Sequence, residues 1–202
     1  PRERKLHLEL RQSDESKALR HAFFAARQDA NPGADKGGTA REIAHVAIVG
    51  GGLMGAGIAT TFLITGCSVC LIEQDEEAAA AGLARVQSLL EGAHKRGKIR
   101  TEKLAETSEK LTSTVNYSDA ANVDLAIEAV FEDLGVKQQV FEKLAAVVGD
   151  TALLATNTSY LDPREIFEGI ANPDRLIGLH FFSTAHIMKL LEDVRLPSTS
   201  AD

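Results

Sequence analysis

The sequence predicts an α/β fold in which helices cover both faces of a doubly wound parallel sheet. Short β-rich runs alternate with helical segments from residue 41 onward, and this alternation is typical of parallel strands joined by crossover helices. A glycine-rich loop directly follows the first run and opens the first of these helices. The composition, with 44% hydrophobic and 25% charged residues, is that of a globular protein and excludes a collagen-like or disordered chain.

Five strands and five helices are expected within this pattern. The strands are placed at 43–49, 68–73, 123–128, 152–156 and 176–180. The helices are placed after the glycine loop to residue 64, at 78–96, 101–110 and 133–148, and from 163 onward. Two of these helices fall between the second and third strands, so they are expected to form a helical hairpin inserted after strand 2. No apolar run approaches the ~20 residues that a membrane-spanning helix needs.

The first forty residues differ from the rest of the chain. Residues 1–40 are expected to form a helix and a linker, and the domain is placed at 41–202. The segment 16–27 is amphipathic, with apolar residues at helical spacing. Glycine and proline at 31–33 and 37–38 are expected to end this helix. Because the chain opens with Pro1 rather than Met, it is expected to be a piece of a longer protein.

Charge and cysteine content limit the kinds of partner. With 22 Lys and Arg against 29 Asp and Glu, the formal net charge is −7, which disfavours nucleic-acid binding. The two cysteines, Cys67 and Cys70, are expected inside a strand with their side chains on opposite faces. That arrangement favours buried reduced thiols over a redox or zinc site, so no metal is expected. Reduced thiols fit a reducing compartment.

The glycine-rich loop predicts a dinucleotide-binding site. The segment after the first strand matches G-x-G-x-x-G and opens a helix, which is the context that this motif requires. Gly50 permits the turn, Gly52 lets the backbone approach a diphosphate, and Gly55 lets the helix pack against the strand. Leu53 and Met54 complete the loop and are expected to contact the cofactor. Free N–H groups and the helix dipole would then face the anion.

An acidic residue at the end of the second strand indicates which cofactor is bound. Glu73 stands there, where a carboxylate would accept hydrogen bonds from the ribose hydroxyl groups of NAD. No Arg or Lys stands beside it in the sequence to bind the 2′-phosphate of NADP, so NAD is favoured. The residues alone leave open the alternative of a plain surface carboxylate after a strand.

A second polar group is expected at the carboxyl ends of the strands, where open parallel sheets bind ligands. His180 ends the last expected strand, Ser159 follows the strand before it, and Glu192 comes 12 residues after His180. A neutral imidazole can accept a hydroxyl proton near pH 7, and a carboxylate can fix its tautomer. A serine hydroxyl could hold the substrate oxygen. Spacing alone leaves open that His180 is an ordinary polar residue at a strand end.

Four sequence blocks together resemble the L-3-hydroxyacyl-CoA dehydrogenase family. They are the glycine loop at 50–59, Ile127-Glu-Ala-Val-Phe-Glu-Asp, Asn157-Thr-Ser, and the block from His180 to Glu192. They occur in the family's order and span about residues 41–196. The segment 16–27 resembles the one that joins the enoyl-CoA hydratase half to the dehydrogenase half in multifunctional β-oxidation enzymes of bacteria and peroxisomes.

The resemblance implies a role for each matching residue. His180 would be the catalytic base and Glu192 the carboxylate paired with it. Ser159 matches the serine that contacts the substrate oxygen and the nicotinamide. Glu132 and Lys137 match a pair near the nicotinamide ribose. NAD is therefore the implied cofactor.

The resemblance also implies an acyl-CoA partner. Ser88 and Lys95, on the long helix after the second strand, fall at the spacing of family residues that touch CoA. The basic run that includes Lys95 could meet CoA phosphates or form a solvated face. Two departures from the family are Thr184, where Pro is usual, and Asp193, where Val is usual. The extra charge of Asp193 is expected to raise the pKa of the Glu192 carboxyl group or to disturb its strand.

The reaction implied by the resemblance is NAD-dependent oxidation of (S)-3-hydroxyacyl-CoA to 3-oxoacyl-CoA in fatty acid β-oxidation, with this chain as the NAD-binding part. The family continues into an all-helical domain that is absent here, so the isolated chain is expected to show little or no activity. That domain and a hydratase domain are the expected partners. The alternatives are another hydroxy-acid dehydrogenase of the superfamily and a non-catalytic nucleotide-fold module. A bacterial cytoplasm and a peroxisome fit equally well.

Overall fold

The computed structural model describes residues 2–29, 39–188 and 190–201, which belong to two compact units. The N-terminal unit contains helices α1 (Arg2–Gln12) and α2 (Asp14–Asp29). A single helix over 16–27 is expected from the sequence, but the structure has two. Ser13 separates them and caps α2, since its hydroxyl accepts a hydrogen bond from the Ser16 N–H at 3.2 Å. The expected break at 31–33 and 37–38 lies outside the described residues.

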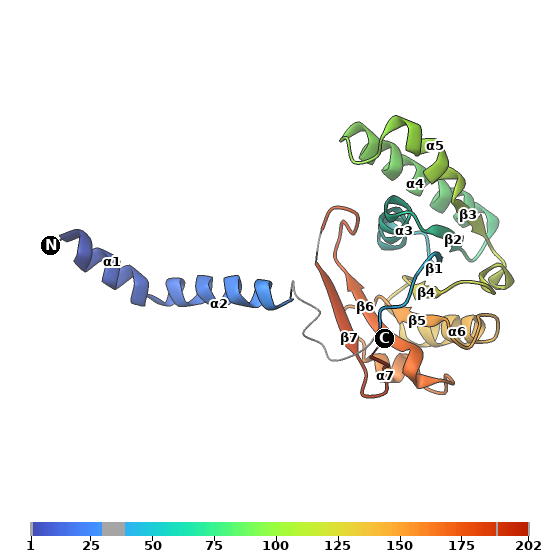
Figure 1. Ribbon diagram of the computed structural model, residues 1–202. Helices are drawn as coiled ribbons and strands as arrows, with labels where there is room; N and C mark the ends of the chain where they lie inside the picture. The colour runs from blue at the N-terminus through green and yellow to red at the C-terminus, as the bar shows by residue number, and fades with distance from the viewer. Residues whose placement is uncertain (1, 30–38, 189, 202) are drawn as a thin grey trace. The chain divides into compact units, whose positions relative to one another are not determined.

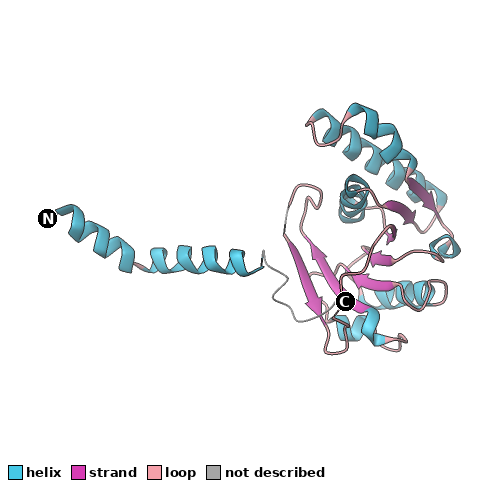
Figure 2. Ribbon diagram, viewed as in Figure 1, coloured by secondary structure: helices cyan, strands magenta, loops and turns pink. Residues whose placement is uncertain are grey.

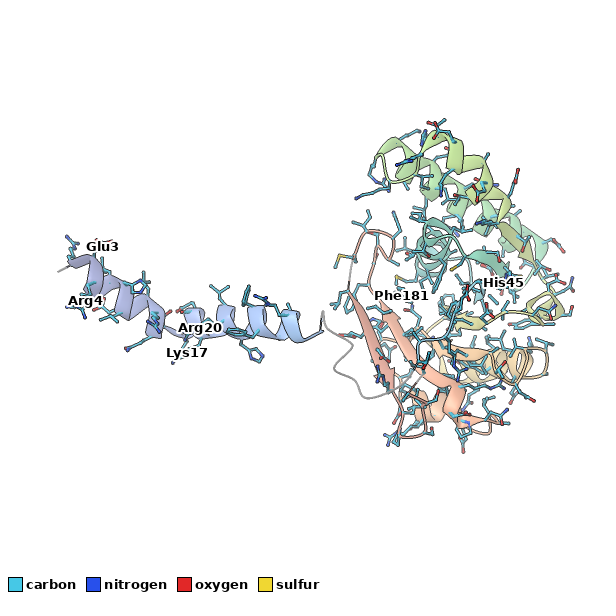
Figure 3. All side chains as sticks on the ribbon, viewed as in Figure 1. Glu3, Arg4, Lys17, Arg20, His45 and Phe181 are labelled. Carbon is cyan, nitrogen blue, oxygen red and sulfur yellow. The ribbon has the colours of Figure 1, made fainter. Side chains whose placement is uncertain are left out.

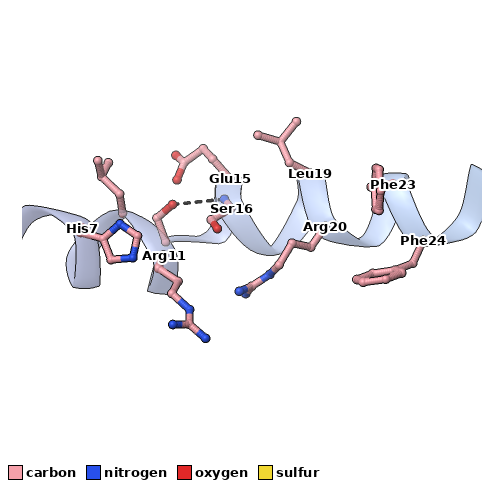
Figure 4. A pocket seen from close by; sticks show the side chains of 10 residues that line it. His7, Arg11, Glu15, Ser16, Leu19, Arg20, Phe23 and Phe24 are labelled. Atoms are coloured by element: carbon pink, nitrogen blue, oxygen red, sulfur yellow. Dashed lines mark hydrogen bonds between the residues drawn. The ribbon is translucent and has the colours of Figure 1, made fainter.

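The apolar side chains of α1 and α2 are exposed. Leu19 and Phe23 keep 72% and 55% of their surface exposed, so the amphipathic stripe of α2 is not buried within its own unit. A shallow hollow lies along these helices and is lined only by residues between 7 and 24 (Figure 4). It contains none of the residues that the sequence predicts for catalysis or cofactor binding.

The second unit, residues 41–200, is built on a seven-stranded sheet with the order β3-β2-β1-β4-β5-β6-β7 (Figures 1 and 2). Strands β1 to β6 are parallel, and β7 pairs antiparallel with β6. The strands are β1 (His45–Val49), β2 (Ser68–Ile72), β3 (Leu111–Thr114), β4 (Leu125–Glu128), β5 (Leu153–Thr156), β6 (Leu176–Phe181) and β7 (Leu191–Arg195). The strand order reverses between β1 and β4, and ligands of open α/β sheets bind at such a point.

Helices pack on both faces of the sheet. Alternation along β1 sends Val46 and Ile48 into one core and Ala47 and Val49 into the other. The helices are α3 (Leu53–Thr65), α4 (Glu76–Lys95), α5 (Thr101–Glu109), α6 (Leu134–Ala145) and α7 (Pro163–Ile166), with short 3₁₀ turns at Tyr117–Ala120 and Pro173–Arg175. Among the described residues, no helix has the length and apolar character needed to cross a membrane.

The predicted fold class is confirmed, including the α4–α5 hairpin after β2. Two strands were not anticipated. In β3 only Leu111 is buried and the other residues are Ser and Thr, so the segment lacks an apolar run. In β7 every residue is exposed and three of the five are charged. Both are edge strands of the sheet, where one side of the strand lacks a neighbour and polar residues are tolerated.

The cysteines depart in part from expectation. Both are free, but they are half-buried rather than buried, and Cys67 precedes β2 instead of lying within it. They do pack against opposite cores, Cys67 on the α3 side and Cys70 on the α6 side. Burial raises the pKa of the Cys70 thiol, which keeps it protonated at neutral pH.

Candidate active site

The glycine loop joins β1 to α3 and leaves space for an anion at the start of that helix. Gly50 has a φ of +95°, and a Cβ there would lie 2.8 Å from the carbonyl oxygen of Ala129. A Cβ at Gly55 would overlap the carbonyl group of Gly50. Gly52 is the N-cap of α3, with no side-chain cap and no atom within 4 Å of where its Cβ would be. Uncapped N–H groups beside an open space are what a diphosphate needs at a helix N-terminus.

Glu73 directly follows β2 and is held against this loop. Its Oε1 accepts a hydrogen bond from the Gly51 N–H at 2.5 Å, and Arg85 of α4 donates to the Gly51 carbonyl oxygen. Side chains therefore hold both backbone polar groups of Gly51. Arg85 was missed by sequence reasoning, because it lies 12 residues after Glu73 and only the packing of α4 brings it to the loop. The glycine residues and the acid have the arrangement of a dinucleotide-binding turn.

His180 and Glu192 face one another across β6 and β7. They are directly opposite in the antiparallel register, and His180 Nδ1 lies 2.7 Å from Glu192 Oε2. The other ring nitrogen, Nε2, lies 3.3 Å from the Ser159 hydroxyl oxygen. When the Nδ1–H group donates a hydrogen bond to the carboxylate, Nε2 carries the lone pair and can accept a proton. The structure thus brings together the three residues that the sequence groups by chemistry.

Contacts around His180 fix the strand that carries it. The Asn157 Oδ1 accepts a hydrogen bond from the Phe181 N–H at 2.8 Å, which ties the residue after β5 to β6. Phe181, labelled on β6 in Figure 3, packs edge-on against Phe62 of α3 at a centroid distance of 6.4 Å. The His180 ring lies 4.5 Å from the Phe182 ring. The sequence places Asn157 within a block of the family resemblance, but this positioning contact depends on the fold.

A charged cluster lies at the ends of β4 and β5. Lys137 Nζ contacts Glu128 Oε1 at 2.6 Å and Glu132 Oε2 at 3.0 Å. Glu132 Oε1 accepts hydrogen bonds from the Thr158 hydroxyl and from the Ser159 N–H. Glu132 and Lys137 therefore lie together beside Ser159. Glu128 was not predicted, although a glutamate ending the otherwise apolar strand β4 is a signal that could have been used.

The cluster gives stability a dependence on pH. Burial favours a higher pKa for Glu132, but hydrogen bonds from Thr158, Lys137 and the Ser159 N–H outweigh it and lower the pKa. A carboxylate with a lowered pKa stabilises the fold fully above its unfolded pKa, which is about 4.3, and loses that contribution as pH falls through its folded pKa. We expect the stability difference between wild type and Glu132→Gln to be largest above about pH 5. Denaturant titrations at a series of pH values measure the free energy of unfolding of both proteins. A difference between them that increases as the pH falls would contradict the prediction.

The remaining predicted residues are more peripheral. Ser88 and Lys95 lie exposed on α4, Leu53 is exposed at the start of α3, and Met54 is half-buried there. Among the described residues, no hydrogen bond or ion pair joins Ser88 or Lys95 to the His180 group. The structure therefore gives no direct support for a CoA contact by either residue.

The two departures from the family are accommodated. Asp193 follows Glu192 in a strand, so it points to the opposite face, and its Oδ2 pairs with Arg195 Nε at 2.8 Å. The strand is formed, so the expected disturbance of the strand is not seen. Thr184 lies in the connection between β6 and β7, where its carbonyl oxygen accepts hydrogen bonds from the N–H groups of Ile187 and Met188.

Comparison with known proteins gives consistent matches. Residues 45–202 match the family model described as "3-hydroxyacyl-CoA dehydrogenase, NAD binding domain". The chain is 44% identical over 190 residues to the glyoxysomal fatty acid beta-oxidation multifunctional protein MFP-a of Brassica napus, covering 93% of this chain and 26% of that protein. It is 39% identical over 197 residues to the human peroxisomal bifunctional enzyme, covering 95% and 27%.

A solved structure shares the fold. The 3-hydroxybutyryl-CoA dehydrogenase of Escherichia coli superposes with a TM-score of 0.75 at 37% identity, over 80% of this chain and 34% of that one. The chain spans about a quarter of the length of the curated relatives that it matches.

Proposed function

Because the chain belongs to the 3-hydroxyacyl-CoA dehydrogenase family, of which it carries the NAD-binding domain, we propose that it oxidises (S)-3-hydroxyacyl-CoA to 3-oxoacyl-CoA with NAD. The observation that carries this proposal is the His180 ring, with Nδ1 2.7 Å from Glu192 and Nε2 3.3 Å from Ser159. It stands at the carboxyl end of β6, in the sheet that also carries the glycine loop.

The proton of the substrate hydroxyl moves to Nε2 of His180. The Ser159 hydroxyl, which lies beside Nε2, is placed to hold the same substrate oxygen. Glu192 fixes the ring so that Nε2 faces the substrate, and its charge stabilises the imidazolium that forms. NAD supplies the hydride acceptor when bound, so the substrate carbon loses hydride as its oxygen loses the proton. The carbon–oxygen single bond of the alcohol thereby becomes the carbonyl double bond of the 3-oxo product.

The loop and the acid support the choice of cofactor. An open space beside Gly52 and the uncapped start of α3 fit a diphosphate. Leu53 and Met54 begin that helix and would lie against the cofactor. Glu73, held by Gly51, would meet the adenosine ribose. At the other end, Glu132 and Lys137 would lie near the nicotinamide ribose.

The binding of CoA rests on the family resemblance and on charge. Ser88 and Lys95 are seven residues apart on the exposed side of α4 and so lie on nearly the same face. The exposed cations Arg96, Lys98 and Arg100 follow Lys95 in the sequence. We assign this surface to the phosphate groups of CoA, in an otherwise acidic chain.

The biological setting follows from the relatives. Relatives at 43–44% identity are named multifunctional proteins of fatty acid beta-oxidation, so we propose that this domain, 41–202, works beside a helical domain and a hydratase domain. The segment 1–40 would be the connection to the hydratase. Peroxisomal and bacterial relatives are both found, and the proposed compartments are accordingly the peroxisome and the bacterial cytoplasm.

The direct test of this function is NADH formation from NAD⁺ and (S)-3-hydroxybutyryl-CoA under single-turnover conditions. The chain is assayed alone and joined to the C-terminal helical domain of a family member. We expect NADH to form in the joined protein. If the joined protein binds NAD but forms no NADH with any hydroxyacyl-CoA, the non-catalytic alternative is favoured. NADH formation from free hydroxy acids alone would favour a different dehydrogenase.

Cofactor preference is a separate prediction. The carboxylate of Glu73, which is held against the loop, would lie beside the 2′-phosphate of NADP, and two adjacent negative groups repel each other. We expect NADPH to bind at least roughly tenfold more weakly than NADH. We expect Glu73→Gln to reduce this difference in affinity. Calorimetric titration of wild type and variant measures both affinities. Equal affinities in the wild type would contradict the role of Glu73.

A further inference from the structure

The charged cluster of Glu128, Lys137 and Glu132 contains two carboxylates and one ammonium group. Lys137 is 1% exposed and Glu128 is 0% exposed. As ionised groups, the three side chains carry one net negative charge. Glu128 and Lys137 form a buried neutral pair, so the net charge falls on Glu132, whose side chain is 26% exposed and is screened by solvent and salt only in part.

The oxygens of both carboxylates accept hydrogen bonds from several donors. Glu128 accepts from the Lys137 ammonium, from the Val130 N–H at 2.8 Å, and from the Thr156 hydroxyl at 2.8 Å. Glu132 accepts from Lys137, from the Thr158 hydroxyl and from the Ser159 N–H. For Glu132 these donors outweigh burial and lower the pKa of the carboxyl group.

Stability alone does not explain a cluster of this kind. Removing charges from water is unfavourable, and well-packed apolar residues of similar size are often as stabilising as a buried ion pair. Charged networks of this type occur frequently at functional sites. The location of the cluster is therefore informative.

One residue, Ser159, links the charged cluster to His180. Glu132 Oε1 accepts the Ser159 N–H at 2.9 Å, and the Ser159 hydroxyl lies 3.3 Å from His180 Nε2. In the proposed function, the substrate carbon that gives up hydride would lie next to Nε2, so the nicotinamide ring would lie beside Ser159 and His180. Glu192 is also close to this position, because it is engaged with His180.

We propose that the net negative charge of Glu128, Lys137 and Glu132 makes the domain bind oxidised NAD more tightly, relative to reduced NAD, than it otherwise would. The nicotinamide ring is positively charged only in the oxidised form, so only that form is attracted. Glu128 acts in this as a positioning residue, since it touches neither substrate nor cofactor and holds Lys137. This inference rests on the proposed function, because it requires NAD to bind with its ring beside Ser159.

Coulomb's law gives the expected size of the effect. For unit charges within about 10 Å at an effective dielectric constant near 20, the attraction corresponds to roughly a tenfold change in affinity. Glu128→Gln and Glu132→Gln each leave the cluster neutral while keeping an oxygen that can accept hydrogen bonds. Both variants are expected to raise the ratio of the dissociation constants of NAD⁺ and NADH by roughly tenfold.

The test is a set of calorimetric titrations of the 202-residue chain with NAD⁺, NADH and ADP-ribose. ADP-ribose lacks the nicotinamide but keeps the ribose that Glu132 and Lys137 would contact, so its affinity measures any change in binding that does not involve the charge of the ring. Glu142→Gln is the matched control, because Glu142 lies exposed on α6, the helix of Lys137, and loses the same charge. Its NAD⁺ to NADH ratio is expected to equal that of the wild type.

The outcomes separate the two proposals. An unchanged ratio in variants that bind ADP-ribose normally overturns this inference and leaves the proposed function intact. If Glu128→Gln fails to fold by circular dichroism, Glu132→Gln decides alone, since its carboxylate is partly exposed. A wild-type chain that binds none of the three ligands contradicts the proposed function itself.

Discussion

Replacing His180 by alanine is expected to lower the rate of hydride transfer by about 10²–10⁴-fold, the usual contribution of a positioned general base. The variant lacks the ring nitrogen 3.3 Å from the Ser159 hydroxyl, which is the group proposed to accept the hydroxyl proton of the substrate. The measurement is single-turnover NADH formation in the chain joined to a helical domain, as for the wild type.

Two controls separate chemistry from binding in this experiment. His180 makes no contact with the glycine loop among the described hydrogen bonds, so the affinity of His180→Ala for NADH is expected to match the wild type. Glu192→Gln keeps a side-chain oxygen opposite Nδ1 but loses the charge that stabilises the imidazolium, and should give an intermediate rate. An unchanged rate of NADH formation in the His180→Ala variant would contradict the proposed mechanism.

The second large effect concerns stability. Lys137→Met is expected to lower the free energy of unfolding by about 3–5 kcal/mol, because it leaves two carboxylates without their cation, one of them fully buried. Urea or guanidinium denaturation of the chain at neutral pH measures the change. The double variant Lys137→Met with Glu128→Gln should recover part of the loss, since the buried negative charge is then gone.

A lysine on the same helix provides the comparison. Lys143 is exposed, and its ammonium group lies 5.4 Å from the centre of the Tyr117 ring. Lys143→Met is expected to change the free energy of unfolding by no more than about 1 kcal/mol. If both methionine variants prove equally stable, Lys137 does not neutralise buried charge.

Local patterns were sufficient for most of the fold. The strand β1, the glycine loop and α3 are adjacent in sequence, and their conformations depend on apolar runs and on glycine at Gly50 and Gly55. Glu73 follows from the same pattern, because a residue at the end of the second strand must lie beside the loop. Spacing alone does not specify the pairing of His180 with Glu192, whereas the family resemblance does.

Features that depend on tertiary contacts were not predictable in this way. The edge strands β3 and β7 form because a neighbouring strand offers hydrogen-bond partners, whereas their own residues are mainly polar. Arg85 reaches Gly51 only because α4 packs against the loop. Glu128 looks like an isolated acid in an apolar strand until the fold brings Lys137 to it.

The antiparallel pairing of β6 with β7 has a consequence for how this domain can vary. His180 meets Glu192 because the two residues are cross-strand partners, and not because twelve positions separate them along the chain. A register slip by one residue would put Leu191 or Asp193 opposite the histidine and turn the glutamate to the other face. Insertions or deletions in the turn are therefore compatible with the histidine–carboxylate pair as long as the ladder keeps its alignment.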